Sequence, residues 1–170
     1  MSDPHSPLRL NVGFIVAQSA GYSRDFPFAV PQIALPPDLL AKNLDGFTRV
    51  TRTPQGILIQ ANLCATLDLE CVRCLNPFPN TLNVNFTELY AFSSRHMTES
   101  SLLMPETGII DLTPVLREYL LLEIPISPLC NTDCKGLCPV CGNNLNEQAC
   151  DHSIESDDLR LDVLKRLLDQ

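Results

Sequence analysis

Seven of the eight cysteines and one histidine lie at spacings that are typical of zinc ligands. Cys71 and Cys74 form one Cys-x-x-Cys pair, and Cys138 and Cys141 form another. Thiolates two residues apart on a tight turn can both face one Zn²⁺ ion, which takes four sulfur or nitrogen ligands. The sequence therefore predicts one or two structural zinc ions. The candidate ligands are Cys71, Cys74, Cys130, Cys134, Cys138, Cys141, Cys150 and His152.

The second pair is followed by Gly142, which can adopt the backbone conformation that folds the chain back over a metal. Disulfides or inert buried thiols are the alternatives, and disulfides need an oxidising compartment. The N-terminus lacks the basic region and the apolar run of a secretory signal, and no apolar run reaches the roughly 18 residues of a membrane span. We therefore expect a cytoplasmic protein, in which cysteines at these spacings favour metal over disulfide.

Eight ligands are enough for two tetrahedral sites, and two Cys-x-x-Cys turns from two hairpins are a common arrangement for one of them. We therefore expect the two Cys-x-x-Cys pairs to share one metal. The second metal would then be bound by Cys130, Cys134, Cys150 and His152. The rival arrangement is a self-contained C-terminal site that leaves Cys71 and Cys74 free.

Residues 57–70 carry the strongest periodic pattern, with apolar side chains at every second position, which predicts a strand with one buried face. Cys64 belongs to the opposite face, so we expect it to be a half-buried thiol and not a metal ligand. Cys71 and Cys74 follow the end of this strand, on the connection to a second alternating segment at 80–92. A pair of strands behind the two cysteines would fix the directions of their side chains.

Other patterns predict the elements around this pair of strands. Alternation over 8–16 predicts a further strand. Thr113 and Pro114 are typical of a helix start, with Thr113 as N-cap, and predict a helix over 114–123. A second amphipathic helix is expected at 157–168. Less regular patterns predict a short strand at 26–30, a short helix that begins within 36–42 and a polar loop at 93–108.

These elements together predict an α+β fold, in which two helices pack against a curved antiparallel sheet and a cysteine-rich C-terminal segment binds zinc. We expect residues 1–170 to form a single domain, which is an ordinary length for one compact core. Within it, residues 130–152 would be the zinc-binding segment and residues 153–170 the terminal helix.

The net charge of −8 is unevenly distributed along the chain. Residues 1–75 carry six basic and six acidic side chains, whereas residues 76–170 carry six basic and fourteen acidic ones. Such a distribution does not suit a protein that grips phosphate nonspecifically. It is typical either of a solvated acidic surface or of a docking face for a basic partner. Any RNA contact would be confined to a local patch, for which Arg49, Arg52 and Arg73 are the candidates.

Several of these motifs resemble those of the YceD family, the large ribosomal RNA subunit accumulation proteins. The similarity rests on Cys71-Val72-Arg73-Cys74-Leu75, on Glu88, on Asp111-Leu112 and on the run from Cys130 to Asn146 that contains Cys134-Lys135-Gly136-Leu137-Cys138. Cys150-Asp151-His152 departs from the family pattern, which has Cys-x-Cys there. Histidine nitrogen is an ordinary zinc ligand, so this substitution can keep the site.

The resemblance implies a role in the synthesis, processing or stability of 23S ribosomal RNA, and hence in large-subunit assembly in bacteria. The expected partner is a basic ribosomal protein or assembly factor, with ribosomal RNA in a pre-ribosomal particle as a possible further contact. Neither a membrane nor a small-molecule substrate is expected.

Two other functions stay open at this stage. A redox-responsive or zinc-responsive switch would use the Cys-x-x-Cys pairs, and a zinc-dependent hydrolase would need an open coordination position with a base beside it. The sequence has no His-Glu-x-x-His motif and no phosphate-binding glycine loop, and thiolate-rich ligand sets weaken the Lewis acidity of zinc. We therefore expect a protein that is not an enzyme. Metal content and a test for RNA turnover would distinguish the three.

Overall fold

The computed structural model describes residues 6–152, in which the chain forms two compact units. The first unit contains the residues up to Leu69 together with Pro77–Pro128. The second contains Glu70–Asn76 and the segment that begins at Leu129. The division into compact units does not test whether the chain is a single domain, so the single domain expected from its length stays a prediction.

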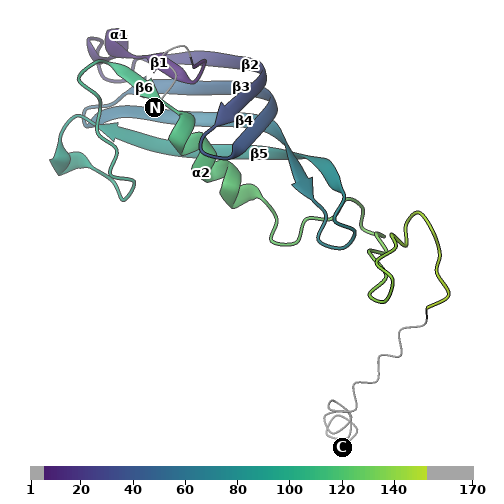
Figure 1. Ribbon diagram of the computed structural model, residues 1–170. Coiled ribbons are helices and arrows are strands. Elements are labelled where there is room, and N and C mark those ends of the chain that lie inside the picture. The colour runs from purple at the N-terminus through teal and green to yellow at the C-terminus, as the bar shows by residue number, and fades with distance from the viewer. Residues whose placement is uncertain (1–5, 153–170) are drawn as a thin grey trace, which may run out of the picture. The chain divides into compact units, whose positions relative to one another are not determined.

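The first unit is built on a four-stranded sheet, in which β2 is followed by β3, β4 and β5 in that spatial order (Figure 1). β3 pairs with both β2 and β4 in antiparallel fashion. The strand predicted at 57–70 is confirmed, and the one predicted at 80–92 is also present but begins three residues earlier. The four strands are β2 at Ser23–Leu35, β3 at Leu39–Arg52, β4 at Gly56–Glu70 and β5 at Pro77–Ala91.

The burial pattern of β4 follows the alternation in the sequence. Six apolar side chains from Ile57 to Leu67 are at most 5% exposed, and they share one face of the sheet. Gln60 and Asn62 on the other face are exposed, and Cys64 on that face is half-buried, as expected. The period of two in the sequence therefore sets which face of the sheet forms the core.

Proline explains why most of β2 gave no strand signal. β2 and β5 are the edges of the sheet, and they carry Pro27, Pro31, Pro77 and Pro79. An edge strand tolerates proline because one of its sides needs no ladder N–H. The short strand predicted at 26–30 is therefore only the middle of a strand of thirteen residues.

The short helix predicted to begin within 36–42 is wrong. A turn occupies this segment, and Leu35 pairs with Leu39 across it, so that β3 starts where the helix was expected. Ala41 and Leu44 are fully buried in the core. Burial of these side chains in a hairpin outweighs the helix-start signal of the two prolines.

The strand predicted at 8–16 is also wrong beyond its first residues. β1 spans only Arg9–Asn11 and pairs with β6, which is Ile109–Asp111, in a separate two-stranded sheet. The chain then turns into the four-residue helix α1, Gly13–Val16, because the Asn11 side chain accepts a hydrogen bond from the Gly13 N–H at 3.2 Å. Ile15 is buried in consequence, whereas Phe14 is 38% exposed.

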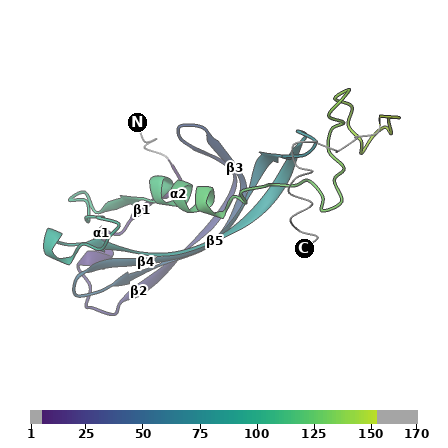
Figure 2. The same cartoon turned by 90° about the horizontal axis from the view of Figure 1, so that it is seen from below.

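The helix α2, Thr113–Glu123, lies on the face of the sheet that carries the core (Figures 1 and 2). It confirms the helix predicted at 114–123, and it buries Val115, Leu116 and Leu120. The predicted N-cap is wrong, however. Leu112 occupies the N-cap position, and the Asp111 carboxylate accepts the Thr113 N–H at 2.9 Å.

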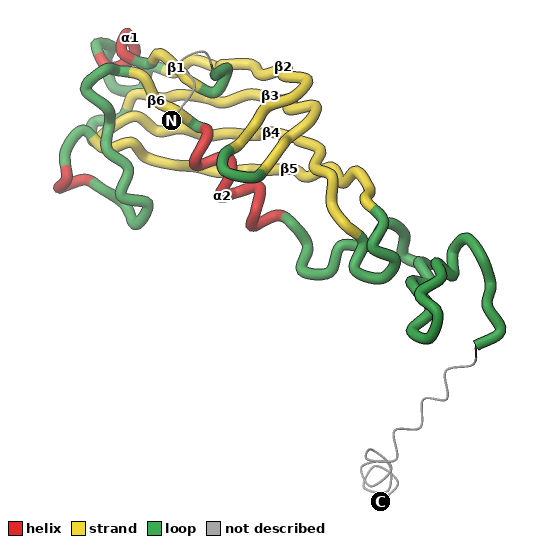
Figure 3. The backbone as a smooth tube through the Cα atoms, in the orientation of Figure 1, coloured by secondary structure: helices red, strands yellow, loops and turns green. Residues whose placement is uncertain are grey.

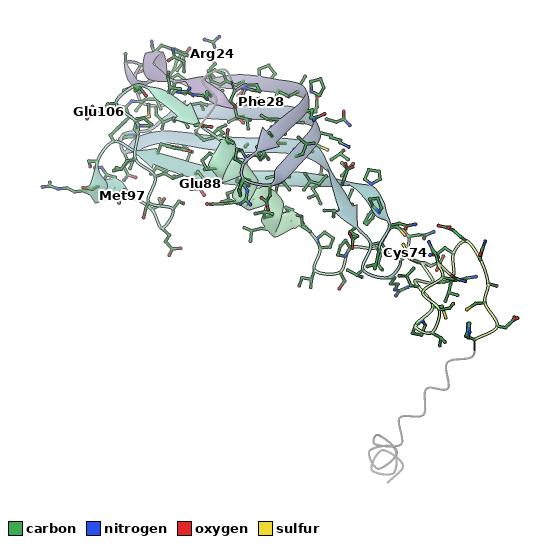
Figure 4. The ribbon with its side chains drawn as sticks, in the orientation of Figure 1. Arg24, Phe28, Cys74, Glu88, Met97 and Glu106 are labelled. Atoms are coloured by element: carbon green, nitrogen blue, oxygen red, sulfur yellow. The ribbon has the colours of Figure 1, made fainter. Side chains whose placement is uncertain are left out.

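Glu88 on β5, which is labelled in Figure 4, accepts hydrogen bonds from two other segments of the chain. The Tyr119 hydroxyl of α2 donates to the Glu88 carboxylate at 2.8 Å, and the Ser100 hydroxyl of the loop after β5 also donates to it. The Tyr119 ring stacks on Phe86, with ring centroids 4.8 Å apart. The hydrogen bond to Glu88 raises the pKa of Tyr119. The loop predicted at 93–108 is confirmed apart from a 3₁₀ turn at Ser94–His96 and an isolated bridge between Leu103 and Ala91.

The cysteine-rich segment contains no helix or strand up to His152, as expected, and its only pairing within the described residues is an isolated bridge between Leu137 and Asn144 (Figure 3). The helix predicted at 157–168 lies outside the described residues. Among the residues that the structure describes, no helix is long and apolar enough to cross a bilayer.

We predict that Leu116→Ala destabilises the first unit by about 2–5 kcal/mol, because the Leu116 side chain is fully buried between α2 and the sheet. Leu122→Ala is the matched control, since it makes the same change in the same helix at a side chain that is 78% exposed. Its effect should stay within about 0.5 kcal/mol. Chemical denaturation measures both, and equal losses would contradict the packing of α2 described above.

Candidate metal centre

The loop between β4 and β5 presents the first cysteine pair on a tight turn. The Leu75 N–H donates to the Cys71 carbonyl at 2.9 Å, and the Cys71 N–H donates to the Asn76 carbonyl at 3.0 Å. Leu75 has a φ of 58°, in the left-handed region. The sequence correctly predicted that Cys71 and Cys74 follow the end of a strand, on its connection to β5.

The second cysteine pair uses the same turn. The Gly142 N–H donates to the Cys138 carbonyl at 2.8 Å, and Gly142 has a φ of 75°. Leu75 and Gly142 both directly follow the second cysteine of their pair. The left-handed residue therefore closes each turn, as expected for Gly142, although a leucine does so in the first pair at some conformational cost.

The first group of ligand atoms joins the hairpin loop to the segment that follows α2. Its sulfur atoms all lie within 4.8 Å of one another and belong to Cys71, Cys74, Cys130 and Cys134. The Cys71 and Cys134 sulfurs are 3.8 Å apart, and those of Cys74 and Cys130 are 3.7 Å apart. All but Cys130 are buried (Figure 4 labels Cys74).

The second group lies within one short stretch of chain. Its ligand atoms also lie within 4.8 Å of one another and belong to Cys138, Cys141, Cys150 and His152. The structure thus brings all eight predicted residues into two groups of four, and the histidine that departs from the family pattern belongs to one of them. Cys64 belongs to neither group.

The expected division of the ligands is wrong. The first Cys-x-x-Cys pair joins Cys130 and Cys134, not the second Cys-x-x-Cys pair. The physical reason is a backbone contact between the hairpin loop and residues 134–137. The Leu137 N–H donates to the Arg73 carbonyl at 3.0 Å, and the Arg73 guanidinium donates to the Cys134 carbonyl at 2.8 Å. The rival arrangement was right about a self-contained second site and wrong about a free first pair.

Two further residues contact the segments that carry the first group. Gly136 has a φ of 78°, and a Cβ atom there would lie 3.0 Å from the Arg73 carbonyl oxygen, so the close approach of the two segments requires glycine. Asn146 donates from Nδ2 to the Cys134 sulfur at 3.3 Å. Sequence reasoning missed Asn146, because the spacing of metal ligands does not indicate it. The only signal that could have found it is an amide side chain, which can donate to sulfur, between two predicted ligands.

The three candidate arginines for a local RNA patch all have partners within the protein. Arg49 forms an ion pair with Asp25 at 2.7 Å, and Arg52 lies 4.4 Å from the centre of the Phe92 ring. Arg73 supports the first ligand group, as described above. A patch on these arginines stays a prediction.

The electrostatics of the first group favour a bound cation. A backbone hydrogen bond from Cys130, with others from Cys74 and Arg73, lowers the pKa of Cys71 to about 6. Desolvation and the neighbouring Cys74 and Cys71 sulfurs raise the pKa of Cys130 to about 12. The Cys71 thiol therefore ionises readily, whereas ionisation of all four thiols requires a positive charge between them.

The second group is prepared in the same way. Backbone hydrogen bonds from Cys141 and Val140 lower the pKa of Cys138 to about 6. Each group therefore offers four ligand atoms, at least one of them a readily formed thiolate. Four sulfurs, or three sulfurs and an imidazole nitrogen, suit a soft or borderline ion in tetrahedral geometry. Both groups could hold a metal ion.

Comparisons with known proteins place the chain in a family. The model of the YceD family, described as Large ribosomal RNA subunit accumulation protein YceD, matches residues 59–168, which include both ligand groups. An uncharacterised protein of Mycobacterium tuberculosis is 36% identical over 104 residues, which are 58% of this chain and 50% of that protein. YlbN of Bacillus subtilis is 30% identical over 104 residues, or 60% of each chain.

A plant relative carries a descriptive name. The Large ribosomal RNA subunit accumulation protein YCED homolog 1, chloroplastic, of Arabidopsis thaliana is 39% identical over 66 residues, which are 39% of this chain and 21% of that protein. The chain spans about half the length of the first curated relatives that it matches. No solved structure matches it. Because the family model covers well over half of the chain, the protein belongs to the YceD family.

Proposed function

We propose that this protein is a non-catalytic factor that supports the synthesis, processing or stability of 23S ribosomal RNA, and with it large-subunit assembly in the cytoplasm. The observation that carries the proposal is the family match over residues 59–168, because it includes both ligand groups. The name of the plant relative supports the same role.

The ligand sets support zinc as the metal of both groups. Zn²⁺ prefers thiolate and imidazole ligands in tetrahedral geometry, and four ligands from the protein are typical of structural sites. When bound, zinc would supply a cross-link between chain segments and the positive charge that the clustered thiolates need. Cys71 and Cys74 would anchor the first ion to the hairpin loop, and Cys130 and Cys134 would hold the segment after α2 against it.

The same count of ligands supports a binding role over catalysis. Catalytic zinc sites usually keep one of four positions open for water or substrate. Each group here offers four protein ligands, and the second group includes a single nitrogen among its three sulfurs. A factor that works by contact with other components fits these ligand sets better than a hydrolase.

The charge distribution supports a basic protein partner. The whole net charge of −8 arises after residue 75, and seven thiolates on two zinc ions would add about three negative charges. Asp133, Glu147 and Asp151 are exposed acids beside the ligand groups. Such a surface would steer a partner rich in lysine and arginine, such as a ribosomal protein in a pre-ribosomal particle.

The first prediction concerns metal content. The purified protein should contain two zinc ions, and a variant with serine at Cys71, Cys74, Cys130 and Cys134 should keep one. Under the earlier division of ligands this variant would lose both ions, because it removes half of each set. Mass spectrometry under native conditions measures the count.

The matched control for this variant replaces the other group. Serine at Cys138, Cys141 and Cys150, together with His152→Ala, should also leave one zinc ion. A protein without zinc, or a variant of either kind without any, would contradict the proposed sites.

The second prediction concerns ribosomal RNA. A strain that lacks the gene should contain less large-subunit RNA relative to small-subunit RNA, and the intact protein should restore the ratio. Quantitative RNA analysis of both subunits measures it. Normal large-subunit RNA in the deletion strain would contradict the proposed function.

The third prediction concerns the partner. Affinity capture should recover a basic protein at about 0.1 M salt and lose it near 1 M, because the Debye length falls from about 10 Å to about 3 Å. Nuclease treatment before capture is the control, and it should leave the partner bound. Tight binding of isolated ribosomal RNA, with no protein partner, would overturn this part of the proposal.

A further inference from the structure

The two ligand groups differ in their exposure to solvent. In the first group Cys71, Cys74 and Cys134 are at most 3% exposed. In the second group only Cys138 is buried, whereas Cys141 and His152 are exposed. A metal in the second group is therefore more accessible to chelators and oxidants than a metal in the first.

Asn146 connects the two groups. It lies between Cys141 and Cys150, within the loop that the second group closes, yet its Nδ2 atom donates to the Cys134 sulfur of the first group at 3.3 Å. A residue that lies between two ligands of one set in the sequence thus contacts a ligand of the other.

The orientation of this amide follows from its neighbours. The Lys135 N–H lies 2.8 Å from one end of the amide, and because a backbone N–H can only donate, that end must be Oδ1. Nδ2 therefore faces Cys134, and its other hydrogen reaches Oδ1 of Asn144 at 2.8 Å. The amide has a partner for each of its donors and for its acceptor.

The loop also holds Asn146 through its backbone. The Asn146 N–H donates to the Asn144 side chain at 3.0 Å, and the Leu145 N–H donates to the Gly136 carbonyl at 2.9 Å. A hydrogen bond to a thiolate ligand stabilises its charge and fixes its direction, and such outer contacts typically change metal affinity by about 10-fold to 100-fold.

We propose that Asn146 is a positioning residue that couples the two metal groups. A metal in the second group holds the loop of residues 142–149, so that Asn146 donates to Cys134 and strengthens metal binding by the first group. Loss of the exposed second metal frees the loop, and the first metal then leaves faster. Because coupling between binding sites is reciprocal, the first metal also strengthens the second. This inference rests on the proposed zinc occupancy of both groups.

The direct test replaces the donor. Asn146→Asp keeps an acceptor for the Lys135 N–H but turns a carboxylate oxygen toward the Cys134 sulfur. Asn143→Asp is the matched control, because it adds the same charge to the same loop at an exposed side chain, and only the backbone of Asn143 bonds to Cys138.

We expect zinc release from the first group, followed by exchange with isotopically labelled zinc so that the second group stays occupied, to become about 10-fold faster in Asn146→Asp and to stay unchanged in Asn143→Asp. With Co²⁺ in place of zinc, four sulfurs and three sulfurs with one nitrogen give different absorption bands, so the two groups can be followed separately. The sulfur-to-cobalt band of the four-sulfur group should shift in Asn146→Asp alone.

The test of coupling removes the second metal by Cys138→Ser together with Cys141→Ser. Release from the first group should become faster in this variant, and adding Asn146→Asp to it should have little further effect, because the two changes break the same connection. Circular dichroism of every variant checks that the sheet of the first unit is retained.

Three results would overturn the inference. Equal release rates in Asn146→Asp and Asn143→Asp would show that the Asn146 amide does not support the first group. Unchanged release from the first group after loss of the second metal would remove the coupling, while the proposed zinc sites would stand. Fewer than two zinc ions in the parent protein, counted first, would overturn the coupling and the proposed zinc sites together.

Discussion

Repulsion between sulfur atoms is the constraint on which the second unit depends. Four thiols within 4.8 Å cannot all ionise in the absence of a cation, because each thiolate disfavours the ionisation of its neighbours. Desolvation and then the neighbouring sulfurs raise the pKa of Cys130, whereas backbone hydrogen bonds lower the pKa of Cys71. Backbone N–H groups stabilise individual thiolates by hydrogen bonds to particular sulfurs, such as that of Cys71. A divalent ion would neutralise the whole set. The segment from Leu129 to His152 forms no helix or strand, so it has few other sources of stability.

The two halves of the first ligand group sit on different supports. Cys71 and Cys74 directly follow β4 in the chain, and they lie on a tight turn that is closed by backbone hydrogen bonds between Cys71 and both Leu75 and Asn76. Cys130 and Cys134 lie in the loop after α2, which has no regular secondary structure. The Arg73 guanidinium and carbonyl instead make the hydrogen bonds that hold this segment in place. Backbone hydrogen bonds thus replace secondary structure around the first group.

The sequence predicted the eight ligands and the strand behind Cys71 because both signals are local: the spacing of the cysteines and the alternation over 57–70. It did not predict the division of the ligands, because that depends on which segment lies against the hairpin loop, and the deciding contact between Arg73 and Leu137 carries no side-chain signal. It missed most of β2 because proline occurs both in loops and in edge strands, so its presence does not distinguish the two. It missed the end of β1 because the Asn11 side chain turns an alternating pattern into a helical turn.

The position of the first cysteine pair has a consequence for the order of folding. Cys74 and Cys130 are separated by 56 positions, which contain all of β5 and α2, whereas the second group spans the short stretch from Cys138 to His152. Closing a longer loop costs more chain entropy, so the second group can assemble early and by itself. The first group has the longer loop to close and therefore the larger entropic cost. A metal ion bound to the first group would then restrain the unfolded chain by roughly 4 kcal/mol, as a disulfide of similar span would.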